Sequence, residues 1–232
     1  MENYYSLPPL VPEALVKKAA EFGSANLCDG MKGLGIACDG CMEASMLPLD
    51  EHSFMVGTAC TVETQEGDNF PIHVAIYQGK PGYVLVVDGN GYMGSAYMGD
   101  LMAGAAKAIG FEGVVLDGCV RDRLGIKEMQ FPVFSKGIMQ RGPSKKGPGK
   151  INTSIKCGGI GVHPGDLVVG DCDGVAVVPR DRIEEVLEAS GKKVAYEIQR
   201  RDAIAEYARC RKEGEPLPNL APSWVIEMLS KH

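Results

Sequence analysis

Apolar residues follow two patterns along this chain, continuous runs and helical spacing, and each pattern predicts a different kind of element. Continuous apolar runs at 83–88 and 113–117 are typical of strands buried on both faces, and a shorter run at 132–134 predicts a third strand. Between the first two runs, residues 100–109 carry apolar positions at helical spacing, and Gly110 follows as a helix-ending residue. Strand, helix and strand in this order predict parallel strands joined by a right-handed crossover.

The segments on either side of this unit predict smaller elements and one long helix. Helical spacing indicates helices at 12–22, 24–31, 68–77 and 181–211, and apolar runs indicate strands at 55–62, 167–169 and 175–179. Ser24 is expected to cap the second of these helices with its side chain. Asp173-Gly174 predicts a tight hairpin between the last two strands. The long helix has a stripe of positions expected to be buried: Ile183, Val186, Leu187, Val194, Ile198, Ile204 and Tyr207.

Two segments have a composition typical of loops. Residues 89–99 are rich in glycine and are expected to connect the first buried strand to the helix at 100–109. Residues 142–150 are rich in Pro, Gly, Ser and Lys, and form either a mobile lid or a solvated connection, of which the second is commoner.

Length and composition bound the class of protein. The chain has 232 residues, which suits one domain, and ordinary hydrophobic and charged fractions of 45% and 23%. A net charge of −6 without a basic face argues against a nucleic-acid partner. No apolar stretch approaches the roughly 20 residues of a membrane span, and Met1–Tyr5 lacks the features of a signal peptide. We therefore expect a cytoplasmic protein with no membrane partner.

The eight cysteines are scattered along the chain, with one CxxC pair at Cys38 and Cys41. A zinc site would require a second pair or nearby histidines, whereas the four histidines are spread apart. Free thiols are the favoured interpretation for this chain, and a metal or redox role for the pair is the weaker one.

Polar residues gather at one predicted edge of the sheet. Loops that follow parallel strands emerge at the same edge, so Asp100 should lie near Arg121 and Asp122. Two carboxylates suit a hard cation such as Mg²⁺ or Mn²⁺, and an arginine fork matches a carboxylate. The N–H groups of Leu101 and Met102 at the helix start suit an anion. A metal beside an anion clamp is what a 2-oxo acid requires, because the metal can stabilise an enolate.

Each of these residues also has a purely structural interpretation. Asp100 fits an ordinary acid in a first helical turn, Arg121-Asp122 fits a surface pair, and Asp117 fits a turn cap. A nicotinamide enzyme is a further alternative, because residues 89–94 fit G-x-G-x-x-G after a strand. The helical pattern starts near Asp100 rather than at the third glycine, and little chain precedes the motif for a substrate domain. The dinucleotide interpretation is therefore the weaker one.

Two long stretches carry a more specific pattern. The first runs from Gly99 to Asp122 and on to Phe131–Phe134, and the second from His163 to Pro179. They resemble the signatures of the RraA-like family, and the likeness extends from Ala25 to Glu197. This family includes class II 4-hydroxy-4-methyl-2-oxoglutarate / 4-carboxy-4-hydroxy-2-oxoadipate aldolases and regulators of ribonuclease E activity.

The resemblance implies distinct roles for the three residues of the pattern D-x20-R-D. Asp122 would be the direct metal ligand, and Asp100 would hold a water molecule on the metal. Arg121 would bind the pyruvyl part of the substrate and steady the enolate. Family branches without the aldolase metal site usually have glycine at the position of Asp100, often with an acid where this chain has Gly125.

The resemblance also implies how the rest of the site is assembled. Backbone amides after Gly99, those of Leu101 and Met102, would bind the substrate carboxylate. Family sites lie between subunits of a trimer, often stacked to a hexamer, and take acids from the neighbour. Asp29 and Glu197 are the matching candidates, although Asp29 replaces a more usual glutamate.

The implied fold is α/β, a single swivelling-type β/β/α domain with a long C-terminal helix. We expect it to span 1–232, with a core at 25–180 and a helix and tail at 181–232 that pack on a neighbouring subunit.

The sequence thus predicts a Mg²⁺- or Mn²⁺-dependent pyruvate aldolase with oxaloacetate decarboxylase side activity. The alternative is a protein-binding regulator of ribonuclease E activity that makes no catalytic use of metal. Asp100 separates the two hypotheses, because a regulator does not require it. The 142–150 loop and the neighbour's C-terminal tail are expected to shape the distal pocket, although neither matches the well-characterised aldolases. The physiological substrate, the metal, the choice of trimer or hexamer, and the detailed roles of this loop and of the Cys38/Cys41 pair stay open.

Overall fold

The computed structural model describes residues 3–231 of the chain. Met1, Glu2 and His232, which entered the signal-peptide and histidine arguments, lie outside the described residues. The chain divides into two compact units, Met1–Ser190 and Gly191–His232, which are described separately. No helix among the described residues is long and apolar enough to cross a membrane.

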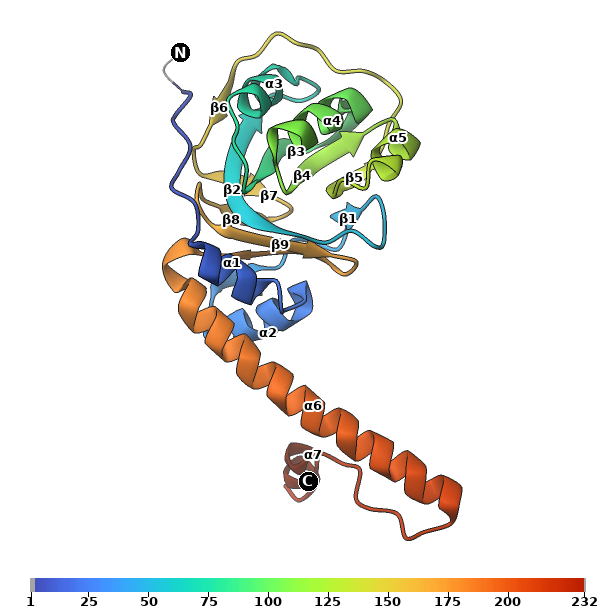
Figure 1. The fold of residues 1–232 in the computed structure, drawn as a ribbon. Helices are drawn as coiled ribbons and strands as arrows, with labels where there is room; N and C mark the ends of the chain where they lie inside the picture. The colour runs from blue at the N-terminus through green and yellow to red at the C-terminus, as the bar shows by residue number, and fades with distance from the viewer. Residues whose placement is uncertain (1–2, 232) are drawn as a thin grey trace. The chain divides into compact units, whose positions relative to one another are not determined.

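The first unit contains most of the regular structure (Figure 1). Its helices are α1 (Glu13–Ala19), α2 (Ser24–Gly33), α3 (Phe70–Tyr77), α4 (Asp100–Ile109) and α5 (Arg123–Glu128), with 3-10 turns η1 (Ala37–Gly40) and η2 (Arg180–Arg182). Its strands are β1 (Leu47–Pro48), β2 (Met55–Thr64), β3 (Tyr83–Met98), β4 (Gly113–Val120), β5 (Val133–Ile138), β6 (Gly149–Ile151), β7 (Ile155–Cys157), β8 (Ile160–Val162), β9 (Leu167–Asp171) and β10 (Gly174–Val178). Helix α6 (Ile183–Glu213) begins in this unit and continues into the second.

Eight of the strands in the described chain form one mixed sheet in the order β1-β5-β4-β3-β2-β9-β10, with β6 also paired to β2. Strands β2 to β5 are mutually parallel, and β1, β6 and β9 pair with them antiparallel. Strand β10 pairs antiparallel with β9. Strands β7 and β8 form a separate two-stranded sheet. The predicted parallel unit is therefore confirmed for β3, α4 and β4.

The sheet separates two apolar cores because successive side chains of a strand point to opposite faces. Leu85 and Val87 of β3 pack with α3, α4 and α5 on one face. Val84 and Val86 pack with β7 and β8 on the other face. The layers are thus a small sheet, a large sheet and helices, as seen in Figure 1. The mixed α/β fold with a long C-terminal helix agrees with the prediction.

The glycine-rich segment 89–99 is not a loop, contrary to the sequence-based expectation. β3 continues through it to Met98 and pairs with β4 through three register shifts, at Tyr92↔Gly118, Ala96↔Cys119 and Met98↔Val120. Bulges of this kind let an irregular strand stay hydrogen-bonded to a regular partner. Gly94 leaves room for the Tyr92 ring, since a Cβ there would lie 2.2 Å from the Tyr92 hydroxyl oxygen.

The predicted cap of α2 is also wrong. Ser24 is the first residue of the helix, and Gly23 occupies the N-cap position. The backbone N–H and the hydroxyl of Ser24 both donate to the Asp171 carboxylate, at 2.6 and 2.7 Å. The side chain therefore joins α2 to the end of β9 instead of capping its own helix.

The cysteine prediction is wrong for two of the eight residues. Cys28 of α2 and Cys41, just after η1, form a disulfide with their Cα atoms 5.9 Å apart. Cys38, the other half of the CxxC pair, is free and exposed. The pairing joins cysteines 13 positions apart, and the CxxC spacing did not indicate it.

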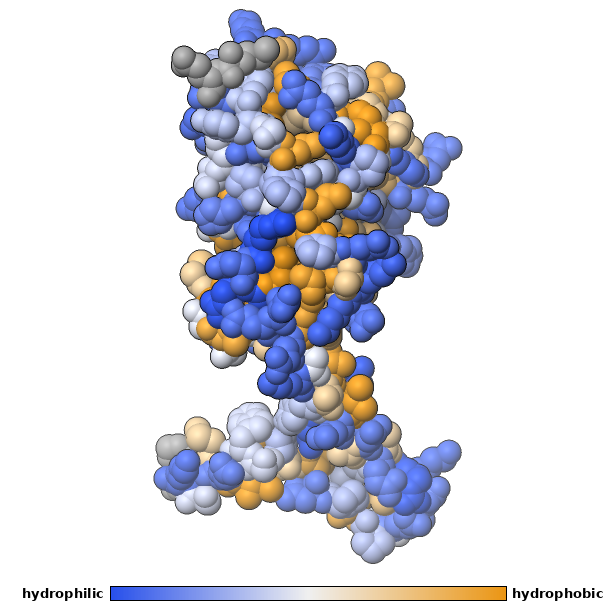
Figure 2. Space-filling view, turned by 60° about the vertical axis from the view of Figure 1, so that its left-hand side comes forward, coloured by the Kyte–Doolittle hydropathy of each residue, from blue (hydrophilic) through white to orange (hydrophobic). Residues whose placement is uncertain are grey.

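The second unit contains most of α6 and the short helix α7 (Ser223–Leu229). The predicted stripe on the long helix is buried only at its start, where Ile183, Val186 and Leu187 enter the core. Ile198 and Ile204 are each 51% exposed in this chain, and Trp224 of α7 is 60% exposed. In Figure 2, hydrophobic residues (orange) are visible on the surface among hydrophilic residues (blue). A periodic apolar pattern alone cannot tell burial in a core from burial against a partner.

Candidate functional site

The junction between β3 and α4 holds the first group of predicted site residues. Gly99 is the N-cap of α4 with extended backbone, and no side chain caps the helix. Asp100 is half-buried in the first turn, where its Oδ1 accepts a hydrogen bond of 2.7 Å from the Leu101 N–H. The Leu101 amide, predicted to bind an anion, is thus engaged by Asp100 in this structure. The position still suits negative charge, because the helix dipole is positive there.

The junction between β4 and α5 holds the second group. The Arg121 N–H donates to the Met98 carbonyl oxygen at 2.9 Å, which ties the ends of β4 and β3 together. Asp122 adopts the left-handed conformation, with φ 57° and ψ 39°, directly before α5. Its Oδ2 lies 3.3 Å from the Arg121 Nε. Left-handed non-glycine residues are uncommon and concentrate at functional sites.

Two glycines make room for the two carboxylates. A Cβ on Gly99 would lie 2.3 Å from the Asp122 Oδ2, and a Cβ on Gly125 would lie 3.0 Å from the Asp100 Oδ2. Neither glycine has a positive φ, so space rather than backbone conformation requires glycine at both positions. The carboxylates therefore depend on small residues from each other's loop.

A cavity of about 360 Å³ brings these groups together. Its lining includes every predicted residue of the two junctions: Gly99, Asp100, Leu101, Met102, Arg121 and Asp122. Asp29 and Glu197 do not line it. Asp29 is exposed on α2, and Glu197 lies on α6 in the second unit, where it pairs with Arg201 at 2.9 Å. Their predicted contribution from a neighbouring subunit stays a prediction.

The cavity has further lining residues, of which the sequence analysis missed those outside the 142–150 loop. Further lining residues come from α3, from the end of β3 and from the chain after β5: Asn69, His73, Tyr97, Met98, Gly142, Pro143 and Lys145. The sequence pattern marked the apolar face of α3 and gave no signal for His73. Gly142, Pro143 and Lys145 belong to the 142–150 loop, which was expected to shape the distal pocket, and the loop does line the cavity.

Asn69 presents a buried acceptor on this side. Its Nδ2 donates to the Tyr97 carbonyl oxygen at 2.9 Å and contacts the Met102 sulfur at 3.2 Å. These contacts orient the amide, and its Oδ1 has no hydrogen-bond partner among residues 3–231 although Asn69 is 2% exposed. Buried polar atoms are normally paired, so this oxygen is suited to accept a hydrogen bond from a ligand.

His73 and Lys145 determine the charge on the same side. Burial lowers the pKa of His73 below its ordinary value, and the positive charge of Lys145 lowers it further. The imidazole is therefore neutral at pH 7, and the cation of this pair is Lys145. With Arg121, the cavity has two cationic side chains on different segments.

The donor set fits a divalent cation. Asp100 and Asp122 are the two acids among the lining residues, and Mg²⁺ usually binds one or two carboxylates while keeping several waters. A different acidic group, Asp171, Cys172 and Asp173, lies at the β9–β10 turn with its ligand atoms within 4.8 Å. Asp171 is already engaged by Ser24, so this group is a structural contact of α2.

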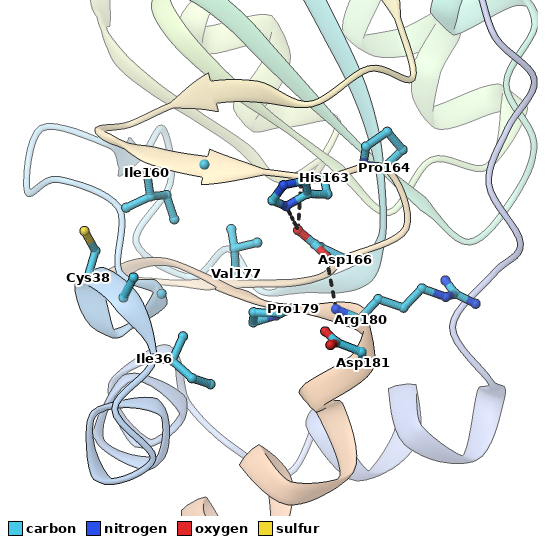
Figure 3. A pocket seen from close by; sticks show the side chains of 13 residues that line it. Ile36, Cys38, Ile160, His163, Pro164, Asp166, Val177, Pro179, Arg180 and Asp181 are labelled. Atoms are coloured by element: carbon cyan, nitrogen blue, oxygen red, sulfur yellow. Dashed lines mark hydrogen bonds and ion pairs between the residues drawn. The ribbon is translucent and has the colours of Figure 1, made fainter.

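A second, larger cavity of about 800 Å³ lies elsewhere in the first unit (Figure 3). Its lining is largely apolar, with Ile36, Ile160 and Val177 pointing toward it in Figure 3. The buried Asp166 accepts hydrogen bonds from the backbone N–H groups of His163 and Arg180, at 2.8 and 3.0 Å. Its carboxylate thus holds the chain before β9 and after β10, and its role at this cavity is structural.

Comparison with known proteins identifies the family. The RraA-like family, described as Aldolase/RraA, matches residues 24–177. A protein of Halalkalibacterium halodurans strain C-125 is 41% identical over 165 residues, 71% of this chain and 79% of its own. It carries the provisional name 4-hydroxy-4-methyl-2-oxoglutarate aldolase.

Two solved structures show the same fold. An uncharacterized protein from Pseudomonas syringae pv. tomato str. DC3000 has a TM-score of 0.75 and 26% identity, covering 86% of this chain and 96% of its own. Streptomyces coelicolor RraAS2, described as an unusual member of the RNase ES inhibitor RraA protein family, has a TM-score of 0.74 and 26% identity. That match covers 82% of this chain and 98% of RraAS2.

Proposed function

The chain belongs to the RraA-like family, and from this premise we propose that it is a divalent-metal-dependent pyruvate aldolase. Its substrate would be a 4-hydroxy-2-oxo acid such as 4-hydroxy-4-methyl-2-oxoglutarate, cleaved to pyruvate and a second oxo acid. The observation that carries the proposal is the convergence of Asp100, Arg121 and Asp122 on one cavity.

Each of these residues has a part that follows from its chemistry. Asp122 would hold Mg²⁺ or Mn²⁺ directly through its carboxylate, and Asp100 would hold it through a water molecule. Arg121 would bind the substrate carboxylate through its planar guanidinium, supported by the start of α4, including the Met102 amide. When bound, the metal supplies Lewis acidity that stabilises the enolate left by carbon–carbon cleavage.

Cleavage also requires proton transfer. A base must take the proton of the substrate hydroxyl as the bond breaks, and an acid must return a proton to the enolate carbon. Asp100 is the candidate within the described cavity, with Asp29 and Glu197 of a neighbouring subunit as further candidates. Loss of CO₂ from oxaloacetate leaves the same enolate, so oxaloacetate decarboxylation is expected as a side activity.

A homotrimer or hexamer forms part of the proposal. Leu101, which lines the cavity, is 86% exposed, and Leu124 in the first turn of α5 is 81% exposed. Large apolar side chains beside a polar site are commonly covered by a partner. A neighbouring copy would cover them and would close the cavity against water.

The similarity to RraAS2 favours one alternative, a protein-binding regulator of ribonuclease activity. Such a regulator would use a surface and would not require two carboxylates facing Gly99 and Gly125. Removing Asp122 or the metal would abolish the turnover of an aldolase. The same changes would leave the protein binding of a regulator intact.

The proposal is tested by pyruvate release from 4-hydroxy-4-methyl-2-oxoglutarate with Mg²⁺, Mn²⁺ or EDTA. We expect metal-dependent turnover that EDTA abolishes and that Asp122→Ala lowers by at least about a thousandfold, because metal activation contributes several kcal/mol. Asp173→Ala is the matched control, since it removes an exposed acid outside the cavity and should leave turnover unchanged. Absence of metal-dependent turnover on this substrate and on a panel of related 2-oxo acids would refute the aldolase function.

A further inference from the structure

Asp68, which the proposed mechanism does not use, connects several parts of the cavity wall. It lies just before α3 and is 2% exposed. Its Oδ1 accepts hydrogen bonds from the N–H groups of Phe70 and Gly147, at 2.9 and 3.1 Å. Its Oδ2 accepts from the Ser144 hydroxyl and from the Lys146 N–H, each at 2.6 Å. One carboxylate thus receives four donors, three of them from residues 144–147.

Backbone hydrogen bonds strengthen the same connection. The Ser144 N–H donates to the Gly67 carbonyl oxygen at 2.7 Å, and the Asn69 N–H donates to the Ser144 carbonyl oxygen at 3.0 Å. Gly67 in turn donates to the Tyr97 hydroxyl at 3.1 Å. The 144–147 segment is therefore joined to the end of β3 and the start of α3, both of which line the cavity.

Lys145 is the residue between these anchors. Ser144 before it and Lys146 after it are both bonded to Asp68, so the backbone that carries Lys145 is fixed on each side. Its side chain lines the cavity near His73. Three residues earlier, Gly142 lies beside Arg121, since a Cβ there would be 3.2 Å from the Arg121 Nη1. The Cα atoms of Gly142 and Lys145 are at most about 10 Å apart, so both cationic side chains reach one cavity from nearby points of the chain.

Two cationic side chains on one cavity suit a substrate with two carboxylates. Arg121 would take the carboxylate of the pyruvyl part, and Lys145 is placed for a carboxylate at the other end. Lysine has a long, flexible side chain, so a fixed backbone reduces the conformational freedom that binding must remove.

Resting on the proposed aldolase function, we propose that Asp68 is a positioning residue that acts through Lys145. Its buried carboxylate holds residues 144–147 so that the Lys145 ammonium stays in the cavity and binds the distal carboxylate of a dicarboxylic 2-oxo acid.

A double-mutant cycle tests this role. Asp68→Asn keeps the size of the side chain and removes one acceptor oxygen, and Lys145→Met removes the charge. Each variant should raise KM for 4-hydroxy-4-methyl-2-oxoglutarate about tenfold with kcat changed less than about twofold, as expected when binding alone is weakened. The double variant should match Lys145→Met, because coupled residues are not additive. A 4-hydroxy-2-oxo acid without a second carboxylate should show changes below about twofold.

Two further variants separate positioning from general stability. Asp166→Asn alters a buried carboxylate that also accepts backbone N–H groups, but at the other cavity, and should leave KM unchanged. Ser144→Ala removes one of the four donors to Asp68 and should raise KM by an intermediate two- to threefold, about a third of a tenfold change in free-energy terms. This milder variant keeps the test valid if Asp68→Asn does not fold.

The positioning role also has readouts that need no turnover. Amide hydrogen exchange of residues 144–147 should accelerate in Asp68→Asn and stay unchanged in Asp166→Asn. The Kd of 2-oxoglutarate, measured by calorimetry with Mg²⁺, should rise in Asp68→Asn and in Lys145→Met alike. These readouts distinguish failure of the inference from failure of the aldolase proposal. Multiplicative KM effects in the cycle, equal effects on both substrates, or unchanged exchange at 144–147 would each overturn the inference.

Discussion

At the scale of single residues, the candidate site depends on two glycines that leave space for its carboxylates. The Asp122 carboxylate occupies the volume that a side chain at Gly99 would fill, and Gly125 leaves the corresponding space beside Asp100. Asp122 also adopts a left-handed backbone conformation, which aspartate tolerates better than most residues. Small residues and one unusual backbone conformation together direct both carboxylates into the cavity.

Gly99→Ala tests this arrangement. The added Cβ would lie 2.3 Å from the Asp122 Oδ2, and the carboxylate must move to relieve that contact. Because misplacement by about 1 Å can cost about a hundredfold, kcat/KM for pyruvate release should fall by about that factor. Gly161→Ala is the control, since its Cβ would meet nothing within 4 Å. Full activity in Gly99→Ala would show that the Asp122 position is not critical.

At the scale of elements, α4 links the sheet to the site. Its buried residues Met102, Ala103 and Ala106 pack on the sheet, and its first turn carries Asp100. The helix ends at Gly110, which has a φ of +103°. The predicted C-terminal stop is therefore confirmed, because this conformation is accessible to glycine and strained for other residues.

Two glycine substitutions in this helix should have opposite effects on stability. Gly104→Ala adds a Cβ 3.4 Å from the Met129 sulfur and should raise the free energy of unfolding by about 0.5–1 kcal/mol, because alanine favours the helix. Gly110→Ala should lower it by about 1–2 kcal/mol or more, since it imposes left-handed strain and a contact of 2.8 Å with Pro81. Urea unfolding measures both, and a destabilising Gly104→Ala or a neutral Gly110→Ala would contradict this account.

At the scale of the whole molecule, we propose that a second copy of the chain completes the site. The cavity of one chain has two acids, and the other candidate acids, Asp29 and Glu197, do not line it. Ile198 and Ile204, close to Glu197 on the exposed part of α6, are apolar without being buried in this chain. In this proposal, a neighbouring subunit would cover these side chains and bring Glu197 to the cavity in one contact.

Mixing two inactive variants tests this assembly. Asp122→Ala and Glu197→Gln should each be inactive alone, because one lacks the metal ligand and the other the neighbour's acid. After co-refolding in equal amounts, roughly a quarter of the sites should combine an intact Asp122 with an intact neighbouring Glu197. Pyruvate release should therefore recover to about that fraction of wild type. If Glu197→Gln alone is active, Glu197 is not part of the site. If activity does not recover on mixing, Asp122 and Glu197 of the same chain contribute to one site, contrary to the proposal.

The sequence by itself determined the elements whose physical cause is local. Continuous apolar runs specified β3 and β4, and a helical period closed by Gly110 specified α4, because burial and backbone preference act over neighbouring residues. Parallel topology then brought Asp100, Arg121 and Asp122 to one edge, as predicted. The family pattern was visible in the same residues.

Tertiary structure decided the features that depend on distant partners. The glycine-rich segment became part of β3 because β4 offered hydrogen bonds across its bulges. Ser24 bonded Asp171 and Cys28 paired with Cys41, contacts that no local pattern indicates. The 142–150 segment became a wall of the cavity because Asp68, about 80 positions away, holds it. Local preferences thus fixed which elements form, and long-range hydrogen bonds decided which loops reach the site.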